Sequence, residues 1–495
     1  MGFLNLVYIG TAATFAYVII SAVYNVYFHP LRKFPGPWFS AATSLPRILG
    51  RVRGIEPYHL QWLHDTYGDV VRVSPNELSY TTARAWKDIH GHGAPVTKDL
   101  DHYGPPSTGT KGLFLADEGD HGRQRRIFSH AFSDRALKDQ EPLFRGYVEL
   151  LIAKLLELGT SEPDAKVNMV DMYNFTTFDI MADLTFGEPL KLLEGSAYNA
   201  WVHGIFAAVK FFGLSTTLRF YFPKINDMLP YVLPVLQKKQ KEHQQYAFDR
   251  VDRRLAATTD RPDIWSYVLK EKGDGQGAQL TVPEMHSNAT TFMIAGTETT
   301  ATLLSGVTYH LLRNPDKMAR LVAEIRGTFA TPQDMTLQNL PQLPYLNACL
   351  EEALRIYPPV PGGLPRLTPP GGTIIEGEHV PGNVTVFVTN WAAYHSPRHF
   401  ALSEQYMPER WLTGDDADPR FADDDKAILQ PFSHGPRNCI GKNLAWHEMR
   451  LILSYTLWHF DLELCKESAH WTDQRVYALW EKHPLMARLK PAQRQ

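Results

Sequence analysis

A single cysteine near the C-terminal end, Cys439, lies in a stretch that restricts the fold more than any other part of the chain. Gly435 and Gly441 bracket it, so the backbone can turn tightly on both sides of the thiol. A cation, Arg437, stands two positions before it, and an apolar helical pattern begins at Leu444. The sequence therefore predicts a tight loop that presents one thiol at the start of a helix.

A thiol in this position has a distinct chemistry. The partial positive charge of a helix N-terminus and a neighbouring cation both favour the thiolate form. A thiolate is a strong ligand for soft metal centres, and on haem iron it favours cleavage of an O–O bond. A lone cysteine, however, is more often a small buried hydrophobic residue. The residues around Cys439 decide between these two interpretations.

Those residues follow a known pattern. The stretch from Phe432 to Gly441 reads Phe-x-x-Gly-x-Arg-x-Cys-x-Gly, and it resembles the haem-binding loop of the cytochrome P-450 family in every fixed position. The resemblance implies that Cys439 is the metal ligand of haem b, that Phe432 covers its sulfur and that Arg437 meets a haem propionate. It also implies a mainly α fold, the cytochrome P-450 fold with a small β region.

A second motif lies inside the longest helical pattern of the chain, residues 283–312. Residues 295–300 read Ala-Gly-Thr-Glu-Thr-Thr, a poor choice for the middle of a buried helix. The Thr299 hydroxyl can bond to the carbonyl of Ala295 and open the helix locally. Taken alone, this hexapeptide is a locally destabilising sequence that a buried helix tolerates. The hexapeptide matches the oxygen-activation motif of the family, which implies that Glu298 and Thr299 are catalytic and relay protons.

The resemblance assigns three more residues to haem binding. His121 and Arg125 lie one turn apart on a helix expected over 117–132, where the family has an aromatic residue or His and then Arg. Without the resemblance, this pair is more simply part of a solvated basic helix face. Arg366 follows a strand-like break, and by resemblance it meets the other propionate.

A Glu-x-x-Arg motif, Glu352 and Arg355, is on its own an ordinary surface ion pair worth about 0.2–0.5 kcal/mol. The family buries this pair and closes it with an arginine from a later segment, and Arg410 in the segment 408–411 supplies one here. Because a buried arginine needs carboxylate partners, the three residues make structural sense together. We therefore expect them to brace the loop of Cys439.

The N-terminal end is different in kind. Residues 1–28 contain no charged side chain, and about 20 apolar residues suffice to span a bilayer, so we expect one transmembrane helix. A secretory signal peptide is the alternative, but it would have a basic start. The first cations, Arg32 and Lys33, follow the apolar run, which places the rest of the chain in the cytosol. We expect a Pro-rich hinge over 29–40 and one large domain over 41–495, held at the endoplasmic reticulum membrane as the resemblance implies.

Charge and cysteine content exclude other classes of protein. The formal net charge of -3 argues against nucleic acid as a partner. The three cysteines, Cys349, Cys439 and Cys465, have no zinc-like spacing and give no disulfide framework. That usage fits a reducing compartment.

Three regions are expected to contact the substrate. Residues 91–115 hold five Gly and three Pro and predict a long irregular loop, which in the family lies over the haem. Residues 197–230 include an aromatic-rich break at 211–230, which fits either core or a loop that dips into the membrane interface. Residues 360–364 are the third region.

All the motifs occur in the order of the family, and the phrases around Arg366, His395 and Trp411 are similar to its filamentous-fungal branch. The resemblance implies a monooxygenase that inserts one oxygen atom from dioxygen into an apolar small molecule of secondary metabolism. Electrons would come from NADPH through a separate flavoprotein, NADPH–cytochrome P-450 reductase. Two alternatives are a haem-thiolate isomerase or dehydratase that needs no reductase, and a non-catalytic haem-binding protein. The complete pair Glu298 and Thr299 argues against both.

Overall fold

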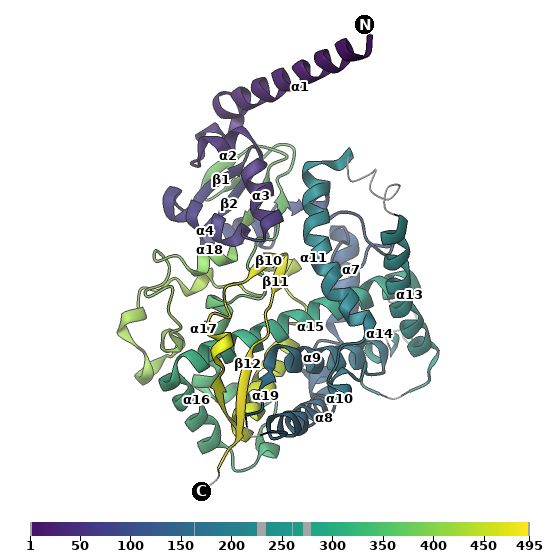
Figure 1. Cartoon of the computed structure of the whole chain (residues 1–495), viewed down its shortest axis with the longest axis vertical. Coiled ribbons are helices and arrows are strands. Elements are labelled where there is room, and N and C mark those ends of the chain that lie inside the picture. The colour runs from purple at the N-terminus through teal and green to yellow at the C-terminus, as the bar shows by residue number, and fades with distance from the viewer. Residues whose placement is uncertain (1, 163, 225–233, 260, 271–278, 494–495) are drawn as a thin grey trace.

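The computed structural model describes residues 2–162, 164–224, 234–259, 261–270 and 279–493. Figure 1 shows an N-terminal helix that points away from the body, a small β-rich part next to it, and a larger helical part. The helices of the larger part are α7 (Glu118–Ser129), α8 (Asp134–Gly159), α9 (Met169–Phe186), α10 (Leu192–Gly195), α11 (Ala200–Tyr221), α13 (Pro234–Ala256), α14 (Ile264–Lys270), α15 (Val282–Arg313), α16 (Pro315–Thr328), α17 (Pro344–Ile356) and α19 (Lys442–His459).

Helix α15 runs through the centre of the helical part (Figure 1). It begins at a capping box in which Thr281 and Glu284 satisfy each other's backbone N–H groups, and it ends before Pro315, whose ring cannot continue the helix. Its 32 residues span about 48 Å. The helix predicted over 283–312 is therefore confirmed. It packs against α9, in which nearly every side chain is buried.

The β-rich part is built on a five-stranded sheet in the order β1-β2-β8-β5-β3. Strands β2 and β8 are parallel, and the other neighbours are antiparallel. The antiparallel register of β3 and β5 pairs Lys98 with Arg366, so two cations from distant parts of the sequence become neighbours. The strands are β1 (Val70–Ser74), β2 (Glu77–Tyr80), β3 (Thr97–Lys98), β5 (Arg366–Leu367) and β8 (Thr385–Val388).

The remaining strands form three further small sheets among the described residues. Strands β4 (Val167–Asn168), β12 (Met486–Pro491) and β9 (Phe460–Leu464) make one, and β6 (Thr373–Ile375) pairs with β7 (Glu378–Val380). A hairpin of β10 (Arg475–Tyr477) and β11 (Leu479–Glu481) contacts α11. Together the sheets confirm the small β region of the predicted fold.

The prediction of a break in the helical pattern over 211–230 is wrong for the first half of that range. Helix α11 continues without interruption to Tyr221, and residues 225–233 lie outside the described part of the chain. Gly213 lies within this helix, at a point where the helix packs closely against the hairpin of β10 and β11. A Cβ atom there would lie 2.9 Å from the backbone carbon of Tyr477 in the hairpin. Likewise, the irregular loop 91–115 contains β3 and one short helix, α6 (Leu100–Tyr103).

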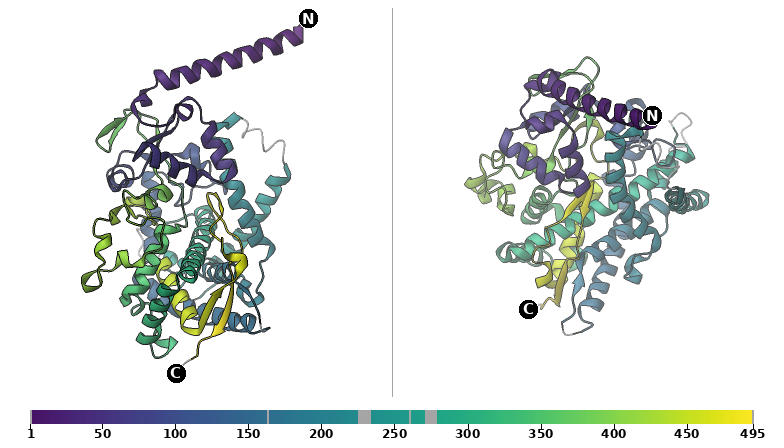
Figure 2. Two further views of the ribbon diagram at one scale, coloured as in Figure 1. Left: turned by 60° about the vertical axis from the view of Figure 1, so that its left-hand side comes forward. Right: turned by 45° about the horizontal axis from the view of Figure 1, so that its top comes forward.

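Helix α1 (Gly2–Tyr27) extends away from the body (Figure 2, left). Its stretch Val7–Tyr27 is long and apolar enough to cross a membrane, and its side chains are exposed. The segment that follows is packed onto the β-rich part. Leu31 and Phe34 are buried in a core cluster with strands β2 and β8, and the N–H of Arg72 donates to the Pro35 carbonyl at 2.7 Å.

Candidate active site

The loop that carries Cys439 is closed by a backbone bond, because the N–H of Cys439 donates to the Phe432 carbonyl at 2.8 Å. Gly435 has φ +74°, and a Cβ atom there would lie 1.8 Å from the His90 carbonyl oxygen. Only glycine fits this position, which ties the loop to the end of α5 (Ala83–His90). Helix α19 begins at Lys442, as the sequence predicts.

Cys439 is accessible although it lies deep in the fold, so its thiol faces an internal space. Burial raises the pKa of the thiol, and the Gly441 N–H, Arg125 and Lys442 act in the opposite direction. The cations expected to favour a thiolate are therefore present, but in the protein alone burial outweighs them. A thiol that is surrounded by protein and still open on one side is suited to bind a cofactor that enters this space.

Helix α15 has a second accessible surface in the interior. Ala295 is exposed and Thr299, one turn later, is half-buried, whereas Thr297, Glu298 and Thr300 between and beside them are buried. The Thr299 hydroxyl donates to the Ala295 carbonyl at 2.6 Å, which is the bond expected from the sequence. One face of the central helix thus borders open space at the motif.

Three of the residues predicted to contact propionates, His121, Arg366 and Arg437, gather with a fourth basic side chain, that of Lys98. Burial, followed by Arg437 and Arg125, lowers the pKa of His121 to about 4. Burial, followed by Arg366 and Arg437, lowers the pKa of Lys98 well below its usual value. Burial, opposed by Tyr103, also lowers the pKa of Arg366, and Arg437 adds to that lowering. Burial and neighbouring positive charges therefore disfavour the protonated forms of Lys98, His121 and Arg366, so the cluster is suited to receive anions.

Among the described residues, the carboxylate that acts on this cluster is that of Glu118, which opposes the lowering of the pKa of Lys98, His121 and Arg366 without cancelling it. Arg437 pairs at 2.9 Å with Glu118, an exposed residue, and donates to the Ala116 carbonyl. Arg125 is also predicted to contact a propionate. Its guanidinium instead donates to the Asn438 carbonyl at 2.7 Å and to the Asn438 side chain, and so holds the Cys439 loop. A cluster of basic side chains near an accessible cysteine fits haem, which carries two carboxylates and an iron that a thiolate can bind.

Lys98 is the residue of this cluster that the sequence did not reveal. It lies in a loop without a motif, and only the pairing of β3 with β5 brings it beside Arg366. Its ammonium donates to the Phe114 carbonyl at 2.5 Å and lies over the ring of Tyr103.

Glu298 and Thr299 point in different directions. Glu298 is buried and forms an ion pair with Lys482, which also donates to Thr302 at 2.7 Å. Among the described residues, no hydrogen bond joins Glu298 to Thr299. The structure therefore places Thr299 at the accessible face and Glu298 behind it, against the C-terminal hairpin.

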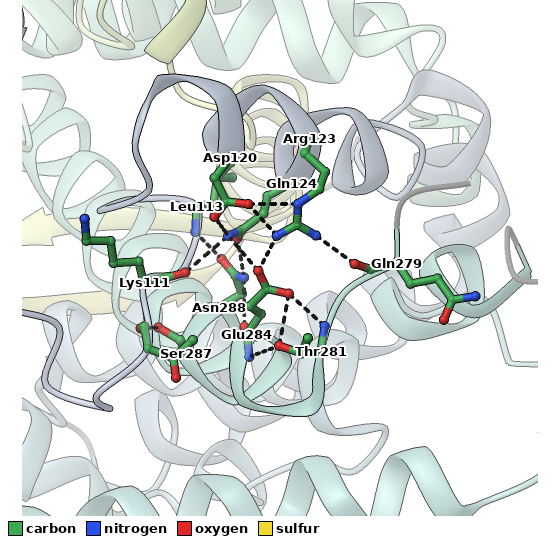
Figure 3. Close-up of polar contacts among 11 residues, drawn as sticks. Lys111, Leu113, Asp120, Arg123, Gln124, Gln279, Thr281, Glu284, Ser287 and Asn288 are labelled. Carbon is green, nitrogen blue, oxygen red and sulfur yellow. Dashed lines mark hydrogen bonds and ion pairs between the residues drawn. The ribbon is translucent and has the colours of Figure 1, made fainter. Parts of the chain in front are cut away.

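A polar clamp holds the segment before α7 onto α15 (Figure 3). The side chain of Asn288 accepts a bond from the Leu113 N–H at 2.7 Å and donates to Gln124 at 2.9 Å. Glu284 accepts bonds from Arg123 and Gln124, which extends the clamp to the first turn of α15. The clamp fixes α7, and with it the buried His121.

Glu352, Arg355 and Arg410 form the buried network that the resemblance implies, and their role in bracing the Cys439 loop stays a prediction. Glu352 contacts Arg355 at 2.7 Å and Arg410 at 3.0 Å, and none of the three side chains is exposed. Trp411 donates to the same carboxylate at 2.9 Å. The motif that alone resembles a surface pair is therefore a buried network.

Comparisons with known proteins agree with this site. A family model described as Cytochrome P450 matches residues 37–486. The chain is 49% identical to the cytochrome P450 monooxygenase efuB of Hormonema carpetanum, over 98% of this chain and 96% of that protein. It is 46% identical to the cytochrome P450 monooxygenase FUM2 of Gibberella moniliformis, over 95% and 100%. It is 40% identical to an averantin hydroxylase of Dothistroma septosporum, over 97% and 91%.

Proposed function

The chain belongs to the cytochrome P450 family and is a monooxygenase, and from this premise we propose that it oxidises an apolar small molecule of fungal secondary metabolism at the site of Cys439. The observation that carries the proposal is the accessible thiol inside the fold beside a buried cation cluster. Relatives named as monooxygenases and a hydroxylase, similar over nearly their whole length, support the reaction class.

Haem, when bound, supplies the activation of dioxygen. Cys439 would be the protein ligand of its iron, and Phe432 would lie beside the sulfur. Lys98 and Arg366 would pair with the propionates and His121 would bond to them, and the propionate charges would offset the burial and repulsion that disfavour the protonated forms of these side chains. Arg437 would join them, and Arg125 would hold the loop through Asn438.

Thr299 would handle protons at the accessible face of α15. Its hydroxyl donates to the Ala295 carbonyl, so its oxygen remains free to accept a bond from water or substrate in the open space. Glu298, one residue earlier, is the acid of the motif and would relay protons, accepting each proton at its carboxylate and passing it toward Thr299. Because the two side chains are not bonded to each other, transfer between them requires water or a rotation of Glu298.

Electrons would come from NADPH through a separate reductase. A groove of about 440 Å³ lies beside the Cys439 loop, lined in part by Ser433, Lys442 and Trp446. A partner bound there would be close to the thiol side of the site. Helix α1 would hold the domain at the endoplasmic reticulum membrane, with Arg32 and Lys33 on the cytosolic side.

The test is the substitution Thr299→Ala. We expect haem binding and NADPH consumption to stay within severalfold of the wild type, while product per NADPH falls and hydrogen peroxide rises. A positioned proton-transfer group contributes about 10²–10⁴-fold, and water entering the gap restores part of that. The substrate is first identified by comparing the metabolites of a deletion strain with those of its parent.

The matched control is Thr291→Ala. Thr291 lies on the same helix and makes the same kind of bond, to the Ser287 carbonyl at 3.0 Å. It should leave coupling unchanged. A fully coupled Thr299→Ala enzyme would disprove the role of Thr299 and would favour an isomerase that needs no proton delivery.

A further inference from the structure

Lys482 reaches the oxygen-activation motif from the C-terminal end of the chain. It follows directly after β11, and its neighbours Glu481 and His483 are exposed. Its side chain nevertheless points inward and is only 3% exposed, and that of its partner Glu298 is 7% exposed. A lysine whose flanking residues are at the surface therefore places its ammonium against a buried carboxylate of α15.

The contacts of Lys482 are specific to one face of α15. Its ammonium donates to Glu298 Oε1 and, at 2.7 Å, to the hydroxyl of Thr302, which lies one turn further along the same face. Two of the three N–H donors of the ammonium thus bind side chains that lie four residues apart on α15. These two bonds fix the position of the ammonium along the helix. Such an arrangement orients the carboxylate as well as neutralising it.

Glu298 keeps one oxygen free of this contact. Its Oε2 atom is buried and has no hydrogen-bond partner in the described part of the protein. A buried carboxylate oxygen without a donor is costly, so it marks a position for a water molecule or another proton carrier. Lys482 therefore holds one oxygen of Glu298 and leaves the other for exchange.

We propose that Lys482 is a positioning residue of the oxidation, which acts through Glu298 by holding its carboxylate with Oε2 available for proton transfer. The proposal rests on the proposed function, because it assigns Lys482 to the proton supply of the same site. The proposal also assigns a function to the segment after β11, in which the sequence shows no motif. A purely structural ion pair would stabilise the fold without affecting proton transfer, so the two roles can be separated by experiment.

The first experiment uses the full-length, haem-loaded enzyme with Lys482→Met and Lys482→Arg. We expect Lys482→Met to lower product per NADPH by about tenfold, less than the roughly 10²-fold or greater loss of a complete relay. Its solvent deuterium isotope effect on product formation should rise, because proton delivery becomes slower. Lys482→Arg keeps the charge and the donors, so it should restore coupling. Haem content and the spectral change on substrate binding should match the wild type in both.

A double-mutant cycle tests whether Lys482 acts through Glu298. The neutral pair Glu298→Gln with Lys482→Met leaves no unpaired buried charge, so it should fold even where a single variant does not. We expect its coupling to equal that of Glu298→Gln alone. A further loss in the double variant would overturn the proposal, and so would a Lys482→Met enzyme with unchanged coupling and isotope effect.

Two comparisons keep these outcomes distinct. Lys210→Met removes a lysine that pairs with Glu481 at 2.6 Å on the exposed side of the hairpin, and it should leave coupling unchanged. Thr299→Ala is measured in the same series. If Thr299→Ala uncouples the enzyme and Lys482→Met does not, only the role of Lys482 is wrong. If Thr299→Ala stays coupled, the proposed proton delivery itself is wrong.

Discussion

Arg355 Nη2 donates to Glu352 Oε1 at 2.7 Å, at a point where neither side chain is exposed. The other terminal nitrogen of Arg355 donates to the carbonyls of Tyr394 and Ser403, both at 2.7 Å. A single guanidinium thus joins α17 to the chain that leads toward the Cys439 loop. The fork of donors matters here, because an ammonium could not reach all of these acceptors from one nitrogen.

Arg355→Lys should therefore impair folding and haem retention. Breaking a buried ion pair costs about 3–5 kcal/mol when one partner is left without its contacts. We expect a lower melting temperature and less haem per protein molecule. Arg420→Lys, at an exposed pair with Asp418, is the control and should change neither quantity. Wild-type haem content and melting temperature in Arg355→Lys would contradict the bracing role.

Cys439→Ser should abolish the spectrum of thiolate-ligated haem together with activity, because a hydroxyl remains protonated at neutral pH and is a poor ligand. The measurement is the absorption spectrum of the reduced carbon monoxide complex. Cys465→Ala, at a buried cysteine near the end of β9, should keep the wild-type spectrum. A red-shifted Soret band in Cys439→Ser would show that another residue is the ligand.

The features predicted best from sequence are those set by local spacing. The Thr299 bond to Ala295 and the pair of Glu352 with Arg355 follow from residues three or four apart on one helix. Resemblance to a family added what spacing alone could not, namely that the latter pair is buried.

The features that were missed depend on contacts between distant segments. Lys98 meets Arg366 only through the register of β3 and β5, and Lys482 meets Glu298 across 184 residues of chain. The break expected over 211–230 failed in its first part for a related reason. A glycine in a helical pattern indicates a break or a close packing contact, and only the position of the hairpin decides between them.

Glu448 on α19 predicts a dependence of stability on pH. Burial raises the pKa of this carboxyl from 4.5 to about 8, and a hydrogen bond with Thr300 opposes the rise. Between those values the folded state holds a proton that the unfolded state has lost, so stability falls as pH rises through this range. Glu448→Gln resembles the neutral acid and should remove that fall.

We expect the melting temperature of Glu448→Gln to exceed that of the wild type by a margin that grows from pH 6 to pH 8. Glu467→Gln is the control, since Lys166 lowers the pKa of that exposed carboxyl and both states are ionised over the range. A constant difference between wild type and Glu448→Gln would show that Glu448 does not hold a proton in the folded enzyme.

Truncations at the N-terminus should separate the anchor from the fold. Helix α1 ends at Tyr27 and is joined to the body through Asn25, whose carbonyl accepts a bond from Arg72 at 2.9 Å and whose side chain donates to the Ala42 carbonyl at 3.2 Å. Because these contacts are few, deletion of residues 2–27 should lower the melting temperature only slightly.

Membrane attachment should be lost only in part, because Trp38 and Leu45 remain as exposed apolar side chains at the starts of α2 (Trp38–Ala42) and α3 (Leu45–Arg53). These two helices lie at the same end of the molecule as α1 (Figure 1). Sedimentation with membranes, with and without salt, measures the remaining attachment.

Deletion of residues 2–33 removes more than an anchor. Leu31 is 0% exposed and packs in the core cluster of the β-rich part, so the longer deletion should destabilise the domain. Loss of a buried leucine side chain costs about 2–5 kcal/mol. Leu31→Ala in the full-length chain should therefore reproduce most of the fall in melting temperature. If the two deletions have the same melting temperature, residues 29–33 act as a linker, and the packing of Leu31 contributes nothing to stability.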